Sequence, residues 1–326
     1  MRFLITLLAA FLPAYVAAQS CGTTDLRELM TPEQSAEVAA ALADQPYTEG
    51  NHWIARRGDD TLHLIGTVHV FDPRLEPVAA RLAPLIEGAD QLLVEATPDA
   101  EAKLQAYLAQ NPQLIRIPAP SLIDRLPPAE WQALADAARA RGIPPAMAAQ
   151  LQPWYLSITL AIPPCVMRDM ASGVRGLDHM LMATATEAGT PIKALEPWTT
   201  VVDIFAADPI EDQIAALRLG VLPEQLANDM MVTLMAQYFD EAHTEVFALS
   251  RVLARDALSL DPAVFDPLFD DMLQALLYTR NDNWMPELLA ARGTSVVAVG
   301  AGHLGGTGGL LDLLAREGFT LERAAF

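Results

Sequence analysis

The segments Leu62-His-Leu-Ile-Gly-Thr-Val-His69 and Val296-Val-Ala-Val-Gly-Ala-Gly-His303 decide the fold, because each is a short apolar run followed by Gly-x-x-His. The apolar runs predict buried strands, and the glycines allow sharp turns where the strands end. A third run, Gln91-Leu-Leu-Val94, is followed directly by Glu95. Functional side chains of open α/β sheets collect at the carboxyl ends of the strands. The sequence therefore predicts two imidazoles and a carboxylate at one sheet edge, which are ligand types of a divalent metal site.

Each of these side chains also has a structural interpretation. A histidine after a strand is commonly an ordinary loop residue or a hydrogen-bonding residue. A carboxylate such as Glu95, placed after apolar residues, is costly to bury unless it is paired, metal-bound or exposed at the strand end, so a structural ion pair is its alternative role. The repeated Gly-x-x-His pattern favours a functional site that includes His69 and His303.

The order of the elements before Glu95 is typical of an α/β protein. His52 to Arg57 and Thr61 to Gly66 predict two strands of a hairpin, joined at Gly58-Asp-Asp60. Leu75 to Glu87 has helical spacing and precedes the strand that ends at Glu95. A strand, helix, strand order gives a right-handed parallel connection. His69 and Glu95 are therefore expected at the same edge of the sheet.

A long, mostly helical segment separates these strands from the last ones. It covers approximately residues 98–291 and contains one further short strand, Pro191 to Leu195, which is followed by Glu196. After it, Thr294 to Val299 and Phe319 to Arg323 predict two more strands. The sequence thus predicts an α/β fold with a central mixed sheet, built from both chain ends, and a large helical insertion.

The first 18 residues have the pattern of an export signal. They carry a positive charge at Arg2, an apolar stretch from Phe3 to Ala18, and the small residues Val16-Ala-Ala18 before a cleavage point. Residues 19–326 are then expected to form a single domain. No later segment offers about 18 uninterrupted apolar residues, so we predict no transmembrane segment in the mature chain. The mature protein is predicted to be periplasmic or secreted.

The chain has two cysteines, Cys21 and Cys165. An exported chain enters an oxidising compartment, where one pair can close one bridge, so we predict a disulfide between them. The alternative is a buried Cys165 with Cys21 free or lipid-modified. Lipid modification is disfavoured because Ala18-Gln-Ser20 lacks the leucine that usually begins a lipobox.

Composition and missing motifs narrow the classes of function. The formal net charge is −20 and the basic residues are scattered, so a nucleic-acid partner is not expected. The glycine-dense loop 300–309 lacks the Gly-Lys-Ser/Thr ending of a phosphate-binding P-loop, and no Gly-x-Ser-x-Gly of a serine hydrolase occurs. His243 has no second histidine four residues on, so we interpret it as a solvated helix residue. His179, beside Asp178, could lie near the site.

An ordered set of motifs resembles the TraB/GumN family of exported or membrane-anchored proteins, which includes the pheromone-shutdown protein PrgY and the Tiki metalloproteases. The resemblance spans roughly His52 to Phe326. Its motifs are Gly66-Thr-Val-His69, Leu93-Val-Glu95, Pro153-Trp154, Gly176-Leu-Asp178, Leu195-Glu196, Arg280-Asn281, Val299-Gly-Ala-Gly-His-Leu304 and Gly309-Leu-Leu. The resemblance implies an α/β core similar to erythromycin esterase and ChaN-like proteins. In the Tiki branch it implies a peptidase that depends on a divalent metal ion.

The resemblance also implies roles for individual residues. His69 and His303 are the implied metal ligands. Glu95, with Glu196 as a further candidate, is implied as a metal ligand or general base. Arg280 and Asn281 are implied as contacts to the substrate or the transition state.

We therefore expect an exported metal-dependent hydrolase that acts on a peptide or protein substrate, with Mn, Co or Zn as the divalent ion. A bound ion would lower the pKa of a water molecule and polarise the scissile carbonyl. Three alternatives stay open: a non-catalytic periplasmic protein that binds haem, metal or peptide, an esterase-type hydrolase, and an exported scaffold with vestigial motifs.

Overall fold

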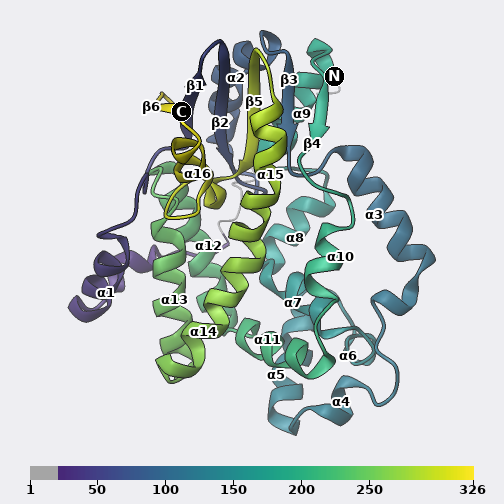
Figure 1. Ribbon diagram of the computed structural model, residues 1–326. Helices are drawn as coiled ribbons and strands as arrows, with labels where there is room; N and C mark the ends of the chain where they lie inside the picture. The colour runs from purple at the N-terminus through teal and green to yellow at the C-terminus, as the bar shows by residue number, and fades with distance from the viewer. Residues whose placement is uncertain (1–20) are drawn as a thin grey trace, which may run out of the picture.

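The computed structural model describes residues 21–326, and the predicted export signal at residues 1–18 lies outside this part of the chain. A six-stranded sheet of order β4-β3-β5-β2-β1-β6 lies at one end of the molecule, at the top of Figure 1. The strands are β1 His52–Arg57, β2 Asp60–Thr67, β3 Gln91–Val94, β4 Ile192–Ala194, β5 Thr294–Gly300 and β6 Thr320–Arg323. Strands β4, β3, β5 and β2 are parallel, whereas β1 is antiparallel to both of its neighbours. The predicted mixed α/β sheet is confirmed.

Five of the six strands come from the two ends of the chain and β4 comes from the inserted segment, as predicted. The C-terminal β5 lies between β2 and β3, so the two Gly-x-x-His segments are neighbours in space. In the register of β2 and β5, Gly66 lies opposite Val299 and Thr67 lies opposite Gly300. Both loops therefore begin at the same edge of the sheet. The likeness of this core to erythromycin esterase and ChaN-like proteins stays a prediction.

Helices account for most of the rest of the chain. The α-helices are α1 Pro32–Leu42, α2 Leu75–Glu87, α3 Pro98–Gln110, α4 Leu122–Arg125, α5 Pro128–Ala140, α6 Pro145–Ala148, α7 Pro153–Ala161, α8 Pro164–Ala171, α9 Leu177–Ala188, α10 Thr200–Phe205, α11 Ile210–Gly220, α12 Glu224–Phe239, α13 Glu245–Leu258, α14 Pro262–Leu273, α15 Thr279–Ala290 and α16 Leu310–Arg316. Shorter turns are η1 Leu26–Leu29, η2 Pro112–Leu114, the π-helical η3 Gln274–Tyr278 and η4 Ala301–His303. Most of the inserted helices lie below the sheet in Figure 1.

Helices cover both faces of the sheet, because successive side chains of a strand point to opposite faces. Leu64 and Val297 belong to a core that includes residues of α15 and α16. Ile65 and Val296 belong to a second core, with residues of α2 and α9. Strands buried on both faces are typical of parallel sheets, and they explain the continuous apolar runs in the sequence.

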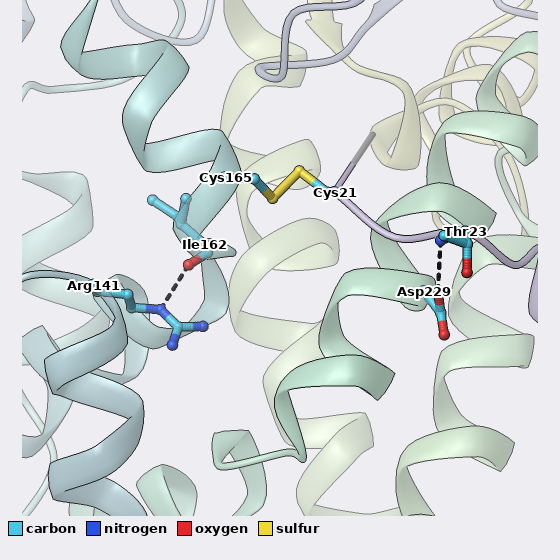
Figure 2. Close-up of a disulfide and its surroundings, with 6 residues drawn as sticks. All are labelled: Cys21, Thr23, Arg141, Ile162, Cys165 and Asp229. Atoms are coloured by element: carbon cyan, nitrogen blue, oxygen red, sulfur yellow. Dashed lines mark hydrogen bonds between the residues drawn. A yellow bond between two sulfur atoms is a disulfide. The ribbon is translucent and has the colours of Figure 1, made fainter. Parts of the chain in front are cut away.

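The predicted disulfide is confirmed, since Cys21 and Cys165 are bonded with their Cα atoms 5.5 Å apart. Figure 2 shows this bond beside the turn between α7 and α8. The segment after Cys21 is also fixed to α12, where Asp229 Oδ1 accepts from the Thr23 amide at 3.0 Å. Within residues 21–326, no helix is both long and apolar enough to span a membrane.

Candidate functional site

The predicted site residues gather at the carboxyl ends of the parallel strands. Glu95 follows β3, Glu196 follows β4 and His303 lies in η4 after β5. Arg280 and Asn281 approach from α15, directly after the π-helical turn η3. A π-helical turn rotates the residues that follow it around the helix axis, and such turns are frequent at functional sites.

Arg280 is the centre of the cluster, because all five of its N–H groups point to protein acceptors. The Nε atom donates to Glu196 Oε2 at 2.8 Å, and Nη2 donates to Glu196 Oε1 at 2.8 Å and to Glu95 Oε2 at 2.6 Å. The Nη1 atom donates to the Leu276 carbonyl at 3.1 Å and contacts His303 Nε2 at 3.3 Å. Its donors are thus used within the protein, so Arg280 positions its neighbours.

Glu95 is ionised and held from two sides. Its Oε2 accepts from Arg280, and its Oε1 accepts from the backbone amide of Gly300 at 2.7 Å. Burial alone would raise the pKa of Glu95, but the charges of His303, which is protonated at low pH, and of Arg280 lower it to about 2. The Oε1 atom lies 3.9 Å from His303 Nε2. A carboxylate and an imidazole nitrogen therefore face each other across a short distance.

Trp284 completes the cluster and was missed by sequence reasoning. Its indole N–H donates to Glu196 Oε2 at 3.0 Å, and its ring centroid lies 4.5 Å from that of His303. Together with the two bonds from Arg280, this contact occupies both oxygens of Glu196. Trp284 lies one helical turn after Arg280, and that spacing on a shared helix face was the available signal.

His303 is a neutral imidazole with a defined tautomer. Asn281 donates its amide to the carbonyls of His303 and Gly308, at 3.3 and 3.0 Å, so its Oδ1 faces His303 Nδ1 at 2.7 Å. The Nδ1 atom is therefore the protonated one, and Nε2 keeps its lone pair. Burial lowers the pKa of His303 to about 4. Asn281 thus positions this imidazole.

His69 lies at the same sheet edge but in different surroundings. Its side chain is 67% exposed, against 4% for His303. Among the described residues, no hydrogen bond or ion pair joins His69 to Glu95 or His303. Its charge is nevertheless close enough to influence the pKa of both groups. The structure thus brings His69 to the region of the cluster without direct contact.

Asp178 positions His69 in the way that Asn281 positions His303. Its Oδ2 lies 3.0 Å from Nδ1 of His69 and 3.0 Å from Nδ1 of His179. Gly176 allows this approach, because a Cβ there would lie 2.0 Å from the carbonyl oxygen of Val68. The Asp178 hydrogen bond raises the pKa of His69 to about 9. Water screens this exposed pair, so we assign no stability to it.

A model of the TraB/PrgY/gumN family matches residues 51–323. The chain belongs to this family. It is similar to the uncharacterized protein YbaP of Escherichia coli, with 26% identity over 280 residues that cover 84% of this chain and 96% of YbaP. The protein of the same name from Shigella flexneri matches at 26% identity over the same shares of both chains. The TraB/PrgY/gumN match includes every strand of the sheet and every candidate site residue.

The donor chemistry of this TraB/PrgY/gumN site fits a metal ion in part. Both His69 and His303 direct Nδ1 to an acceptor, so Nε2 is the nitrogen that could ligate a metal, as is typical of metal-binding histidines. In His303 this atom also faces Arg280 Nη1 at 3.3 Å, and in His69, whose pKa is raised to about 9, it must first lose a proton. Glu95 adds an ionised carboxylate to these two imidazoles. Glu196 fits less well than Glu95 as a ligand. It accepts three hydrogen bonds from Arg280 and Trp284, two of them at Oε2, whereas each oxygen of Glu95 accepts one. As the side chains stand, residues 21–326 contain no group of three or more close ligands.

Proposed function

We propose that this protein is an exported hydrolase that cleaves peptide bonds at the carboxyl edge of its sheet. The observation that carries the proposal is the matched pair of histidines, each with Nδ1 held by a side-chain oxygen, so that Nε2 is the nitrogen available for ligation or proton transfer. Two imidazoles prepared in this way, next to an ionised carboxylate, are suited to proton transfer and to metal ligation. The choice of peptide bonds rests on the resemblance to the Tiki metalloproteases. Export is supported by the Cys21–Cys165 disulfide.

A divalent ion is part of this proposal, with His69, His303 and Glu95 as its ligands and Mn, Co or Zn as candidates. When bound, it would supply a water of lowered pKa and polarise the scissile carbonyl. Arg280 compensates part of the charge of Glu95 and Glu196, so these carboxylates alone would retain a divalent cation weakly. Binding therefore requires the nitrogen ligands, and removing either histidine is expected to abolish it.

The other residues of the cluster act by positioning. Asn281 fixes the orientation of His303, and Asp178 fixes that of His69. Arg280 holds Glu95 against the turn at Gly300. Glu95 is the group that we expect to receive the proton of the attacking water, and Glu95→Gln should remove turnover while peptide binding persists.

The test compares the mature wild-type protein with His69→Ala/His303→Ala and with Glu196→Gln as a matched control outside the ligand set. Each is loaded with Mn, Co or Zn in turn, and metal content and cleavage of a quenched fluorescent peptide library are measured. We expect stoichiometric metal and cleavage in the wild type, neither in the double variant, and retained metal in Glu196→Gln. Circular dichroism verifies folding.

Other outcomes would replace the proposal. A folded wild-type protein without metal uptake or cleavage would favour the non-catalytic binding protein. Ester hydrolysis without peptide cleavage would favour the esterase-type hydrolase. Metal that is lost in Glu196→Gln but kept in the double histidine variant would overturn the ligand assignment.

A further inference from the structure

A pocket of about 190 Å³ lies within the inserted helices, away from the sheet edge. It is lined mainly by apolar side chains of α5, α12 and α13 and of the turn between α7 and α8, and Met230 and Met231 contribute thioethers. Apolar cavities of about 150 Å³ already bind molecules of the size of benzene. The pocket is therefore large enough for a small organic ligand.

Arg141 lines this pocket and carries a positive charge without a neutralising partner. It donates from Nε to the Ile162 carbonyl at 2.7 Å, from Nη1 to Ala137 at 3.0 Å and from Nη2 to Leu160 at 2.6 Å. Figure 2 shows the bond to Ile162 beside the disulfide. Three of the five N–H groups are thus used, and all three acceptors are neutral carbonyls. The guanidinium retains two donors for an anion.

No carboxylate lies within salt-bridge distance of Arg141 among residues 21–326. Glu224 acts on it only at longer range, and burial lowers the pKa of Arg141. A partly buried cation without an anion is costly, because desolvation is not repaid by an ion pair. A bound carboxylate would supply the missing partner.

Gln237 is a second polar group in the wall of the pocket without a partner. The residue is 1% exposed, and its Nε2 atom has no hydrogen-bond acceptor among the described residues. Buried donors are rarely left unpaired, since each costs free energy of folding. The Nε2 atom is closed off from the pocket as the side chain lies, and rotation of the amide would bring this donor to a ligand oxygen inside the pocket. Gln237 and Arg141 thus both have N–H donors without an acceptor, whereas the other lining side chains favour contact with an apolar part of a ligand.

We propose that this pocket binds a medium-chain alkyl carboxylate, with its carboxylate at Arg141 and Gln237 and its chain against the apolar side chains that include Met230 and Met231. The lining residue Pro163 lies two positions before Cys165, so the disulfide holds that rim of the pocket in place. The site is separate from the cluster at the sheet edge and does not depend on the proposed hydrolase activity.

The test titrates the mature, disulfide-bonded protein with octanoate, octanol and octylammonium, which share one tail and differ in charge, by isothermal calorimetry. We expect saturable binding of octanoate at one site and affinity for octylammonium at least about tenfold lower. Arg141→Gln should lower the affinity for octanoate by about tenfold or more and leave the affinity for octanol nearly unchanged. Ser250→Phe, which places a ring in the pocket, should weaken both octanoate and octanol. His69→Ala, at the sheet edge, is the matched control and should bind octanoate normally.

If Arg141→Gln fails to fold, Gln237→Leu provides a second variant of the polar wall. It should lower the affinity for octanoate more than the affinity for octanol. Equal affinity for octanoate and octylammonium would overturn the assignment of a carboxylate. Octanoate binding that does not saturate, or that is as tight in Ser250→Phe as in the wild type, would overturn the assignment of this pocket as the binding site.

Discussion

Arg280 at the sheet edge and Arg141 in the inserted helices are both partly buried, but their partners differ. Arg280 uses all five N–H groups and is paired with Glu95 and Glu196. Arg141 donates to three backbone carbonyls and forms no ion pair among the described residues. The sheet edge is therefore a polar cluster in which one cation is paired with two carboxylates, whereas the helical region presents a cation without an ion pair to an apolar pocket. The partners of a buried charge, rather than its residue type, indicate whether it stabilises the fold or binds a ligand.

The largest expected effect tests the first half of this comparison. Arg280→Met leaves Glu95 and Glu196 without their cation in a site that is little exposed. Removal of one partner from a buried ion pair costs about 3–5 kcal/mol, so we expect the free energy of unfolding to fall by that amount. Urea denaturation followed by tryptophan fluorescence measures it. Arg280→Lys keeps the charge and should lie between wild type and Arg280→Met, whereas a loss under about 1 kcal/mol would show that water, and not Arg280, stabilises the carboxylates.

The helical region has a covalent crosslink in place of an ion cluster. The disulfide closes a loop with a sequence separation of 144 residues between Cys21 and Cys165. Replacing both cysteines with serine should lower the free energy of unfolding by about 2–4 kcal/mol, because the unfolded chain gains freedom. The same denaturation experiment measures it, with the reduced wild-type protein as control. An unchanged stability would mean that the contacts of Thr23 and Leu26 with α12 hold this segment without the crosslink.

Much of the fold could be predicted from the sequence, because short apolar runs with a glycine after them specify buried strands and their ends. The strands before Glu95 and before the second histidine loop follow this rule. The disulfide followed from a count of two cysteines in an exported chain. The Arg280 ion cluster did not follow from the pattern. The carboxylates were expected to bind metal, and only the packing of α15 places a guanidinium between them.

The two histidine loops show why the site was harder to predict than the fold. Their sequences are alike, yet His303 is enclosed by Asn281 and Trp284 while His69 stays largely exposed beside Asp178. These surroundings come from helices far away in the sequence, so the local motif could not distinguish them.

The interpretation of His243 as a solvated residue was wrong, because the side chain is 2% exposed. It packs against Gly305 in the loop 300–309, and the local sequence around His243 does not reveal this contact.

His243 extends the comparison to a buried group that can lose its charge. Burial lowers its pKa to about 4, below the ordinary value of 6.5. The unfolded chain therefore takes up a proton first, so the contribution to stability is complete above pH 6.5 and decreases as the pH falls toward 4. When the pH falls from 6.5 to 5, the free energy of unfolding of the wild type should decrease by about 1.5–2 kcal/mol more than that of His243→Gln. Denaturation curves at both pH values measure this difference, and parallel losses in the two proteins would show that His243 does not control this pH range.

The smallest effect is expected for Arg141, and it is the most direct contrast with Arg280. Arg141→Gln removes hydrogen bonds to the carbonyls at the ends of α5 and α7, but it also removes a partly buried cation that no carboxylate neutralises. These terms oppose each other, so the free energy of unfolding should change by only about 1 kcal/mol without ligand. Urea denaturation in parallel with Arg280→Met measures the ratio of the two effects. A loss as large as that of Arg280→Met would mean that Arg141 holds the helices together, and the contrast between the two arginines would then disappear. Octanoate should raise the free energy of unfolding of the wild type by more than that of Arg141→Gln, because a ligand stabilises the folded state in proportion to how tightly it binds.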